Sequence, residues 1–163
     1  TCSRCDMAAE QQKALAARME GEFEYVLEMR GAPDGEWSAS KGTASYASVL
    51  GGRALRGAWK GEGGFESEET IAFDGLRQEF LTVSLDNMSP QPMVYGGTWD
   101  EAAAVLLRAG TMDDPMSGAR DKAFRTETRF PAAGGWVYSM HWAHSDGREF
   151  EVLRATMAPR PAQ

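Results

Sequence analysis

The sequence is poor in the residues that most often build metal and redox sites. It contains two cysteines and two histidines in 163 residues. A structural zinc site needs four ligands, usually supplied as two closely spaced pairs. Here one CxxC motif is the only cysteine pair, and His141 and His144 do not complete it with the spacing of a zinc motif. We therefore expect no metal site.

Basic clusters and long apolar stretches are scarce as well. The chain has 17 Lys and Arg against 24 Asp and Glu, which gives a formal charge of −7. Because such a surface repels phosphate backbones, we expect no nucleic-acid partner. The longest fully apolar run, Ala102 to Leu107, is far too short to cross a bilayer, so no membrane span is predicted.

Both cysteines lie at the start of the sequence, in Cys2-Ser3-Arg4-Cys5. A CxxC motif forms a redox pair, half of a metal site or a local disulfide. A redox motif is expected to follow a strand and open a helix in a βαβ unit, and no strand precedes this one. The sequence favours an irregular terminus. A local disulfide between the two cysteines remains an open alternative.

One helix and about ten strands are predicted along the chain. Residues 7–20 are rich in Ala, Gln, Lys and Leu, with Asp6 as a candidate N-cap and Gly21 as the stop. The hydrophobic period then changes from about 3.6 to 2. Strand-length runs cover residues 22–30, 37–50, 53–60, 65–73, 78–86, 92–99, 103–110, 121–130, 136–144 and 148–157. Residues 102–107 could alternatively be helical.

Turn signals between these runs are typical of an antiparallel meander, and so many strands in a small domain favour closure into a barrel. The predicted fold class is all-β: a single antiparallel meander β-barrel of about ten strands with one N-terminal helix. Residues 1–20 would form the CxxC segment and a helix that caps one end, and residues 21–160 the barrel, as one domain overall.

Several motifs resemble a known family in order and spacing. They are Leu50-Gly51-Gly52-Arg53-Ala54-Leu55, Thr70-Ile71-Ala72-Phe73-Asp74, Asp86-Asn87-Met88-Ser89, Gly97-Thr98-Trp99-Asp100, Asp114-Pro115-Met116-Ser117-Gly118 and Asp146-Gly147-Arg148-Glu149-Phe150. From about Gly21 to Met157 the chain is similar to a bacterial domain-of-unknown-function family. The resemblance implies a calycin-type (lipocalin-like) barrel, distantly related to the nitrobindin barrels that bind heme. With its few cysteines, such an acidic chain fits the bacterial cytoplasm or periplasm equally well.

A barrel of this size encloses a space lined by the inward half of each strand. The inward residues are mostly aromatic or Met, which favours a site for a flat or apolar small molecule. An ordinary packed core would have the same composition and remains an alternative. A homodimer is compatible with the sequence. The predicted ligand-binding residues are Tyr25, Arg53, Trp59, Tyr95, Trp99, Tyr138, Trp142 and His144.

Glu69 is the candidate catalytic residue. It shares the predicted inward face of its strand with Phe65, Ile71 and Phe73, and even register would place it opposite Gly57, which leaves it room. Arg53 would be its charge partner. A buried carboxyl group of this kind suits general acid/base chemistry. A β-bulge that turns Glu69 outward is the alternative.

Two further groups of residues carry alternatives. His141 and His144 have opposite parity in one strand, and the nitrobindin resemblance makes either a candidate heme ligand. Arg125, Glu127 and Arg129 alternate with Phe124, Thr126 and Thr128, as in a solvated charge ladder. If Arg125 and Arg154 instead faced inward, they would form an anion site.

These observations predict a barrel that binds a small hydrophobic or aromatic ligand. Two alternatives stay open: an isomerase or cyclase that uses Glu69 as acid/base, and a heme-binding barrel. No cofactor other than heme is suggested by the sequence.

Overall fold

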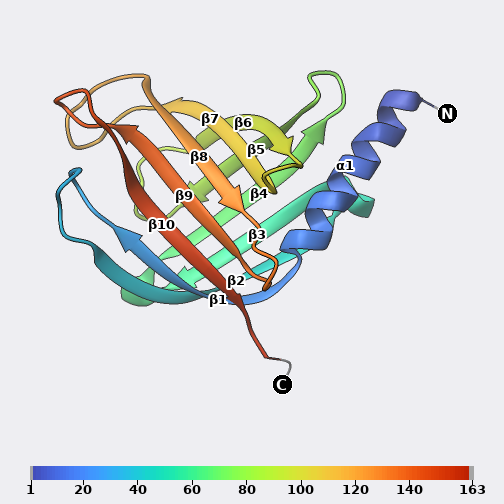
Figure 1. Cartoon of the computed structure of the whole chain (residues 1–163), viewed down its shortest axis with the longest axis horizontal. Helices are drawn as coiled ribbons and strands as arrows, with labels where there is room; N and C mark the ends of the chain where they lie inside the picture. The colour runs from blue at the N-terminus through green and yellow to red at the C-terminus, as the bar shows by residue number, and fades with distance from the viewer. Residues whose placement is uncertain (1, 162–163) are drawn as a thin grey trace.

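The computed structural model describes residues 2–161, which form one α-helix and ten strands (Figure 1). The predicted all-β barrel with a single N-terminal helix is confirmed. The elements are α1 (Ser3–Met19), β1 (Gly21–Met29), β2 (Ser38–Val49), β3 (Ala54–Gly61), β4 (Glu66–Asp74), β5 (Glu79–Asp86), β6 (Met93–Asp100), β7 (Val105–Met112), β8 (Lys122–Arg129), β9 (Trp136–Ala143) and β10 (Glu149–Pro159).

The strands form a closed antiparallel meander. Each pairs with its neighbours in sequence, and β1 pairs with β10 to close the ring. Every second connection therefore lies at the same end of the barrel. We call the end near α1 the helix end, and the opposite end, with the connections at residues 30–37, 62–65, 87–92, 113–121 and 144–148, the loop end (Figure 1). In the described part of the chain, no helix has the length and apolarity needed to cross a membrane.

The helix begins earlier than the sequence predicts. Its N-cap is Cys2 rather than Asp6, because the backbone N–H groups of Cys5 and Asp6 donate to the Cys2 carbonyl oxygen at 2.8 and 3.0 Å. The prediction of an irregular terminus is therefore wrong for residues 3–6. Cys2 and Cys5 are both exposed free thiols.

The inner face of α1 closes the helix end of the barrel. Its buried residues Ala8, Leu15, Ala16 and Met19 belong to one core cluster with Leu55, Ile71, Phe73, Phe80 and Leu106. Gln12, only 1% exposed, donates from Nε2 to the Ile71 carbonyl oxygen at 3.1 Å and accepts from the Phe73 backbone N–H at 2.9 Å. The pairing of β3 with β4 runs only to Leu55 and Ile71, so the Gln12 amide continues the ladder where β3 stops.

Two local predictions are wrong. Residues 102–104 form a turn, and Val105 starts β7, so this segment is not helical. Arg53 does not share the inward face of β3. It follows a 3-10 turn over Leu50–Gly52, has helical backbone angles (φ −78°, ψ −19°) and is exposed. The turn breaks the period of two, which is why alternation counted back from Leu55 fails there.

Candidate functional site

The barrel contains a cavity of about 130 Å³ between its inner walls. Its lining is largely apolar and aromatic, with one carboxyl group, Glu69, in the middle of β4 and a second, Asp86, at the loop end. The lining residues are Leu27, Trp59, Phe65, Ser67, Glu69, Ser84, Asp86, Met93, Tyr95, Tyr138, Met140 and Leu153. They come from β1, β3, β4, β5, β6, β9 and β10 and from the turn that precedes β4. Most of the strands thus converge on one space.

Glu69 faces this cavity, as predicted, and is held by a short chain of hydrogen bonds. The Tyr46 hydroxyl donates to Oε1 of Glu69, and the Trp59 indole N–H donates to the Tyr46 oxygen at 2.7 Å. Burial of the Tyr46 ring, followed by the charge of Glu69, raises the pKa of Tyr46 well above its usual value. Tyr46 therefore keeps its proton and serves as a fixed donor, while Oε2 of Glu69 accepts no hydrogen bond from the described residues.

The register of β3 and β4 is the predicted one, with Gly57 opposite Glu69. The space above Gly57, however, is filled by Tyr46 rather than by Glu69. A Cβ atom at position 57 would lie 2.4 Å from Cε1 of the Tyr46 ring, far inside van der Waals contact. Glycine is thus needed here because the ring that orients Glu69 lies flat against the backbone.

The opposite wall is formed by two tyrosines in front of a buried arginine. Tyr95 and Tyr138 line the cavity, and the Arg108 guanidinium lies 5.0 and 6.0 Å from their ring centroids. Burial raises the pKa of both tyrosines, that of Tyr138 well above its usual value. Both phenols are therefore neutral hydroxyl groups that can donate to or accept from a molecule in the cavity.

Arg108 is held by neutral partners. It is 3% exposed and donates to Thr82 Oγ1 at 2.7 Å and to Thr128 Oγ1 at 2.9 Å. No carboxyl group of the described residues forms an ion pair with it, and its Nε has no hydrogen-bond partner. Burial opposes the charge, but Tyr95 and Glu69 outweigh it and raise the pKa of Arg108. A positive charge thus persists inside the barrel, stabilised by hydroxyl groups and aromatic faces.

A cluster of aromatic rings supports the Glu69 wall. The Trp59 ring lies 4.9 Å from Tyr25 and 6.3 Å from Trp136, and Trp136 packs at 5.2 Å against Tyr46. Most of these pairs are edge-to-face, a favourable geometry for aromatic rings. Tyr25 therefore supports Trp59 from behind and is not itself part of the cavity lining.

The predicted ligand-binding residues fall into separate places. Trp59, Tyr95 and Tyr138 line the cavity together with Glu69. Trp99 packs at the helix end against Phe130, with the Arg18 guanidinium 4.5 Å above its ring. Arg53 is outside the barrel and cannot be the partner of Glu69. The cavity therefore contains only part of the predicted set.

Trp142 and His144 belong to a different feature, an open groove at the loop end. There the Lys122 ammonium group lies 4.2 Å from the Trp142 ring centroid and 3.1 Å from Oδ2 of Asp114. His144 is near Asp146, with Nδ1 at 3.3 Å from Oδ2. Neither Trp142 nor His144 is part of the cavity lining.

The histidines do not fit a heme site in the cavity. His144 lies at the loop end, and His141 alternates with the inward residues Met140 and Trp142 and pairs across the sheet with Arg125. Burial and the charge of Arg125 lower the pKa of His141. The donor atoms in the cavity lining are carboxyl and hydroxyl oxygens, an indole N–H and thioether sulfurs, with no imidazole among the described residues.

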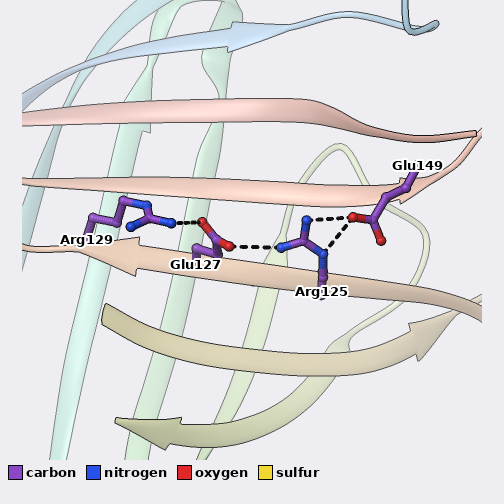
Figure 2. A network of polar contacts seen from close by, with 4 residues as sticks. All are labelled: Arg125, Glu127, Arg129 and Glu149. Carbon is purple, nitrogen blue, oxygen red and sulfur yellow. Dashed lines mark hydrogen bonds and ion pairs between the residues drawn. The ribbon is translucent and has the colours of Figure 1, made fainter. Parts of the chain in front are cut away.

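The charged residues of β8 face outward, as the ladder interpretation predicts (Figure 2). Glu127 accepts from Arg129 at 2.7 Å and from Arg125 at 3.0 Å, and Arg125 also donates to Glu149 at 2.8 Å. Arg154 is likewise outside, beside Glu28 and Glu151. The alternative in which Arg125 and Arg154 form an inward anion site is wrong.

Two central residues were missed by sequence reasoning. Tyr46 lies in a strand of small and polar residues where alternation is weak, although Ala44 shares its parity and is also buried. Arg108 is two residues after Leu106 and so lies on the same, inward face of its strand. An arginine between apolar residues is nevertheless normally expected to be exposed. A search for inward parity irrespective of residue type would have found both residues.

The fold and the interior site together define a closed ten-stranded antiparallel β-barrel with a small aromatic cavity and an oriented carboxyl group in its wall. The family model described as "Protein of unknown function (DUF1579)" matches residues 8–158, and the chain belongs to this family. The resemblance to a family of unknown function is thereby confirmed, and the match extends into α1. A comparison with curated proteins found no match.

Proposed function

We propose that the barrel binds a small hydrophobic or aromatic molecule in the cavity beside Glu69. The observation that carries this proposal is the carboxyl group itself. It lies among apolar side chains, is oriented by Tyr46 and Trp59 on one oxygen, and presents the other oxygen without a protein partner. An acceptor oxygen that faces a largely apolar cavity and has no protein partner favours a ligand that supplies a donor.

The volume of the cavity limits the size of this ligand. Sites for drug-sized molecules occupy about 300–1,000 Å³, whereas this cavity measures about 130 Å³. An engineered apolar cavity of about 150 Å³ is known to hold benzene. The proposed ligand is therefore a single-ring molecule, much smaller than a typical lipocalin ligand.

The polar groups limit its chemistry. A group that donates a hydrogen bond fits Oε2 of Glu69, and the Tyr95 and Tyr138 hydroxyls on the other wall can complement a second polar group. A carboxylate in the ligand has no hydrogen to donate to Oε2 of Glu69. We therefore propose a neutral ring with a donor group, and expect anionic rings to be excluded from this wall.

Three probes of equal ring size test this proposal: aniline, toluene and benzoate. We expect aniline to bind more tightly than toluene, and benzoate to bind least, as measured by ligand-observed NMR and calorimetry. Glu69→Gln places an amide N–H₂ or a weaker acceptor against the aniline donor. It should reduce the preference for aniline over toluene about tenfold, since a hydrogen bond to a charged group contributes about 1.5–3 kcal/mol.

Glu68→Gln is the matched control, because Glu68 is the adjacent glutamate on the exposed face of the same strand. It should leave all three affinities unchanged. If none of the probes binds at millimolar concentration, or if aniline and toluene bind equally to the unaltered protein, the proposed site is wrong.

A second candidate function is a proton-transfer enzyme, an isomerase or cyclase with Glu69 as general acid/base. The hydrogen-bond chain from Trp59 through Tyr46 favours it, because a fixed carboxyl group beside a substrate is what proton abstraction requires. On a substrate once found, Glu69→Gln should abolish turnover while binding persists. Full turnover in this variant would rule out the acid/base role.

A further inference from the structure

A second chemically active feature lies outside the barrel, at the first turn of α1. We propose that Cys2 and Cys5 form a redox-active dithiol that exchanges with low-molecular-weight disulfides and closes to an intramolecular disulfide. This proposal is independent of the cavity and of the function proposed for it.

The positions of the two cysteines match what such a pair needs. Cys2 is the N-cap of α1, and Cys5 is three residues further, on the same side of the first turn. Both are exposed free thiols, three residues apart in one helical turn. An outside disulfide can therefore reach either sulfur, and the second thiol is next to the first.

The turn is held in place by the barrel rather than left to fray. Ala8, one turn further along, is 2% exposed, and Gln12 pairs with the backbone of β4. The turn at Gly75 packs closely beneath it: a Cβ atom there would lie 3.0 Å from the Arg4 carbonyl oxygen. The dithiol thus sits on a rigid support, and the helix dipole stabilises a thiolate at its N-terminus.

The two thiols have different environments. The Cys5 thiol and the backbone N–H groups of Cys5 and Arg4 lower the pKa of Cys2, whereas its hydrogen bond to Cys2 raises the pKa of Cys5. Asp6 acts on both thiols against the charged form, while Arg53 favours it at Cys5. Cys2, which is the N-cap of α1 and faces the free N–H groups of its first turn, is therefore assigned as the attacking sulfur and Cys5 as the resolving one.

The exchange proceeds in two balanced steps. The Cys2 thiolate attacks one sulfur of the small disulfide, so that a mixed disulfide forms and one small thiolate leaves. Cys5 then loses its proton to solvent and attacks Sγ of Cys2, which releases the second small thiolate. The protein is oxidised by two electrons, and the small disulfide is reduced to two thiols.

Intact-protein mass spectrometry with oxidised glutathione as the probe tests the proposal on the full chain. The protein should lose the mass of two hydrogens without retaining glutathione, and dithiothreitol should restore the original mass. Cys5→Ser should accumulate the mixed disulfide, because no resolving thiol is present. Cys2→Ser should react about tenfold more slowly than Cys5→Ser, since only the thiol at position 2 is at the N-cap, where the backbone N–H groups favour the thiolate.

Two outcomes would overturn the proposal: a stable mixed disulfide on the unaltered protein, or equal rates for the two single variants. A third comparison removes the support of the fold. In urea the difference between Cys2→Ser and Cys5→Ser should disappear, and if it persists the helix is not its cause. Circular dichroism of both variants confirms that α1 is intact, and probe binding in the cavity should be unchanged.

Discussion

Charged side chains have different kinds of partner on the inner and the outer face of this barrel. Outside, Arg125 and Arg129 pair directly with Glu127 and Glu149 in water (Figure 2). Inside, Arg108 and Glu69 are each held by neutral groups, hydroxyls and aromatic rings. Pairing on the surface neutralises each charge and contributes little energy. The interior arrangement orients both polar groups without an ion pair, which suits the proposed binding site.

The largest expected difference between the walls is at their arginines. Arg108→Ala leaves an internal void and two buried threonine hydroxyls without their donor. Relief of the buried charge offsets part of this cost, so we expect a loss of about 2–4 kcal/mol in the free energy of unfolding. Arg125→Ala, its outer counterpart, should cost less than about 1 kcal/mol. Urea unfolding measures both, and equal losses would contradict the comparison.

In α1, the neutral buried amide of Gln12 takes the place of a strand partner for the backbone of β4. Gln12→Ala leaves the Ile71 carbonyl and the Phe73 N–H unsatisfied, which should cost about 2–3 kcal/mol. Gln11→Ala removes the same side chain from the neighbouring, partly exposed position and should change stability little. Thermal unfolding followed by circular dichroism tests this. Similar transition temperatures for the two variants would show that the Gln12 hydrogen bonds contribute nothing.

Gly57 tests how the inner wall orients its carboxyl group. Gly57→Ala forces the Tyr46 ring away from β3, so we expect a loss of about 1–3 kcal/mol from overpacking. The preference for aniline over toluene should fall as well, because Tyr46 then no longer fixes Glu69. Gly31→Ala is the control, since no atom lies within 4 Å of its Cβ position. Unchanged probe binding in Gly57→Ala would separate Tyr46 from the site.

The smallest effect is expected from acid on the outer ladder. Hydrogen bonds from Arg125 lower the pKa of Glu149, and those from Arg129 and Arg125 outweigh burial and lower the pKa of Glu127. A lowered folded-state pKa adds stability above the unfolded-state value, and this stability is lost as pH falls through the folded-state value. The small cost of Arg125→Ala should therefore vanish at acid pH and in about 1 M salt. A cost that survives both conditions would mean that packing, not charge, is responsible.

Alternation in the sequence predicts which face of a strand a residue occupies. It placed Glu69 inward opposite Gly57, and Arg125 and Glu127 outward, because a period of two is a property of the backbone itself. It failed at Arg53, where a 3-10 turn interrupts the strand. It also left Tyr46 and Arg108 unrecognised, because burial of polar or isolated aromatic residues depends on partners from distant strands.

Alternation also does not predict where a residue lies along the barrel axis. Trp99 and Trp142 were expected beside Trp59, yet one lies at the helix end and the other at the loop end. The height of a residue depends on strand tilt and on the stagger between neighbouring strands, which side-chain period does not encode. For the same reason the sequence indicated an aromatic interior but not the small size of its cavity.

The seam between β1 and β10 has a consequence for biosynthesis. Of the strands in this barrel, β1 is made first, yet one of its two partners, β10, is made after all the others. Until then the nascent sheet has two open edges, which are sites for pairing with other chains. Ring closure depends on the most distant contacts in the barrel, so we expect this barrel to complete folding slowly and only after β10 has been made, with its edges in need of protection until then.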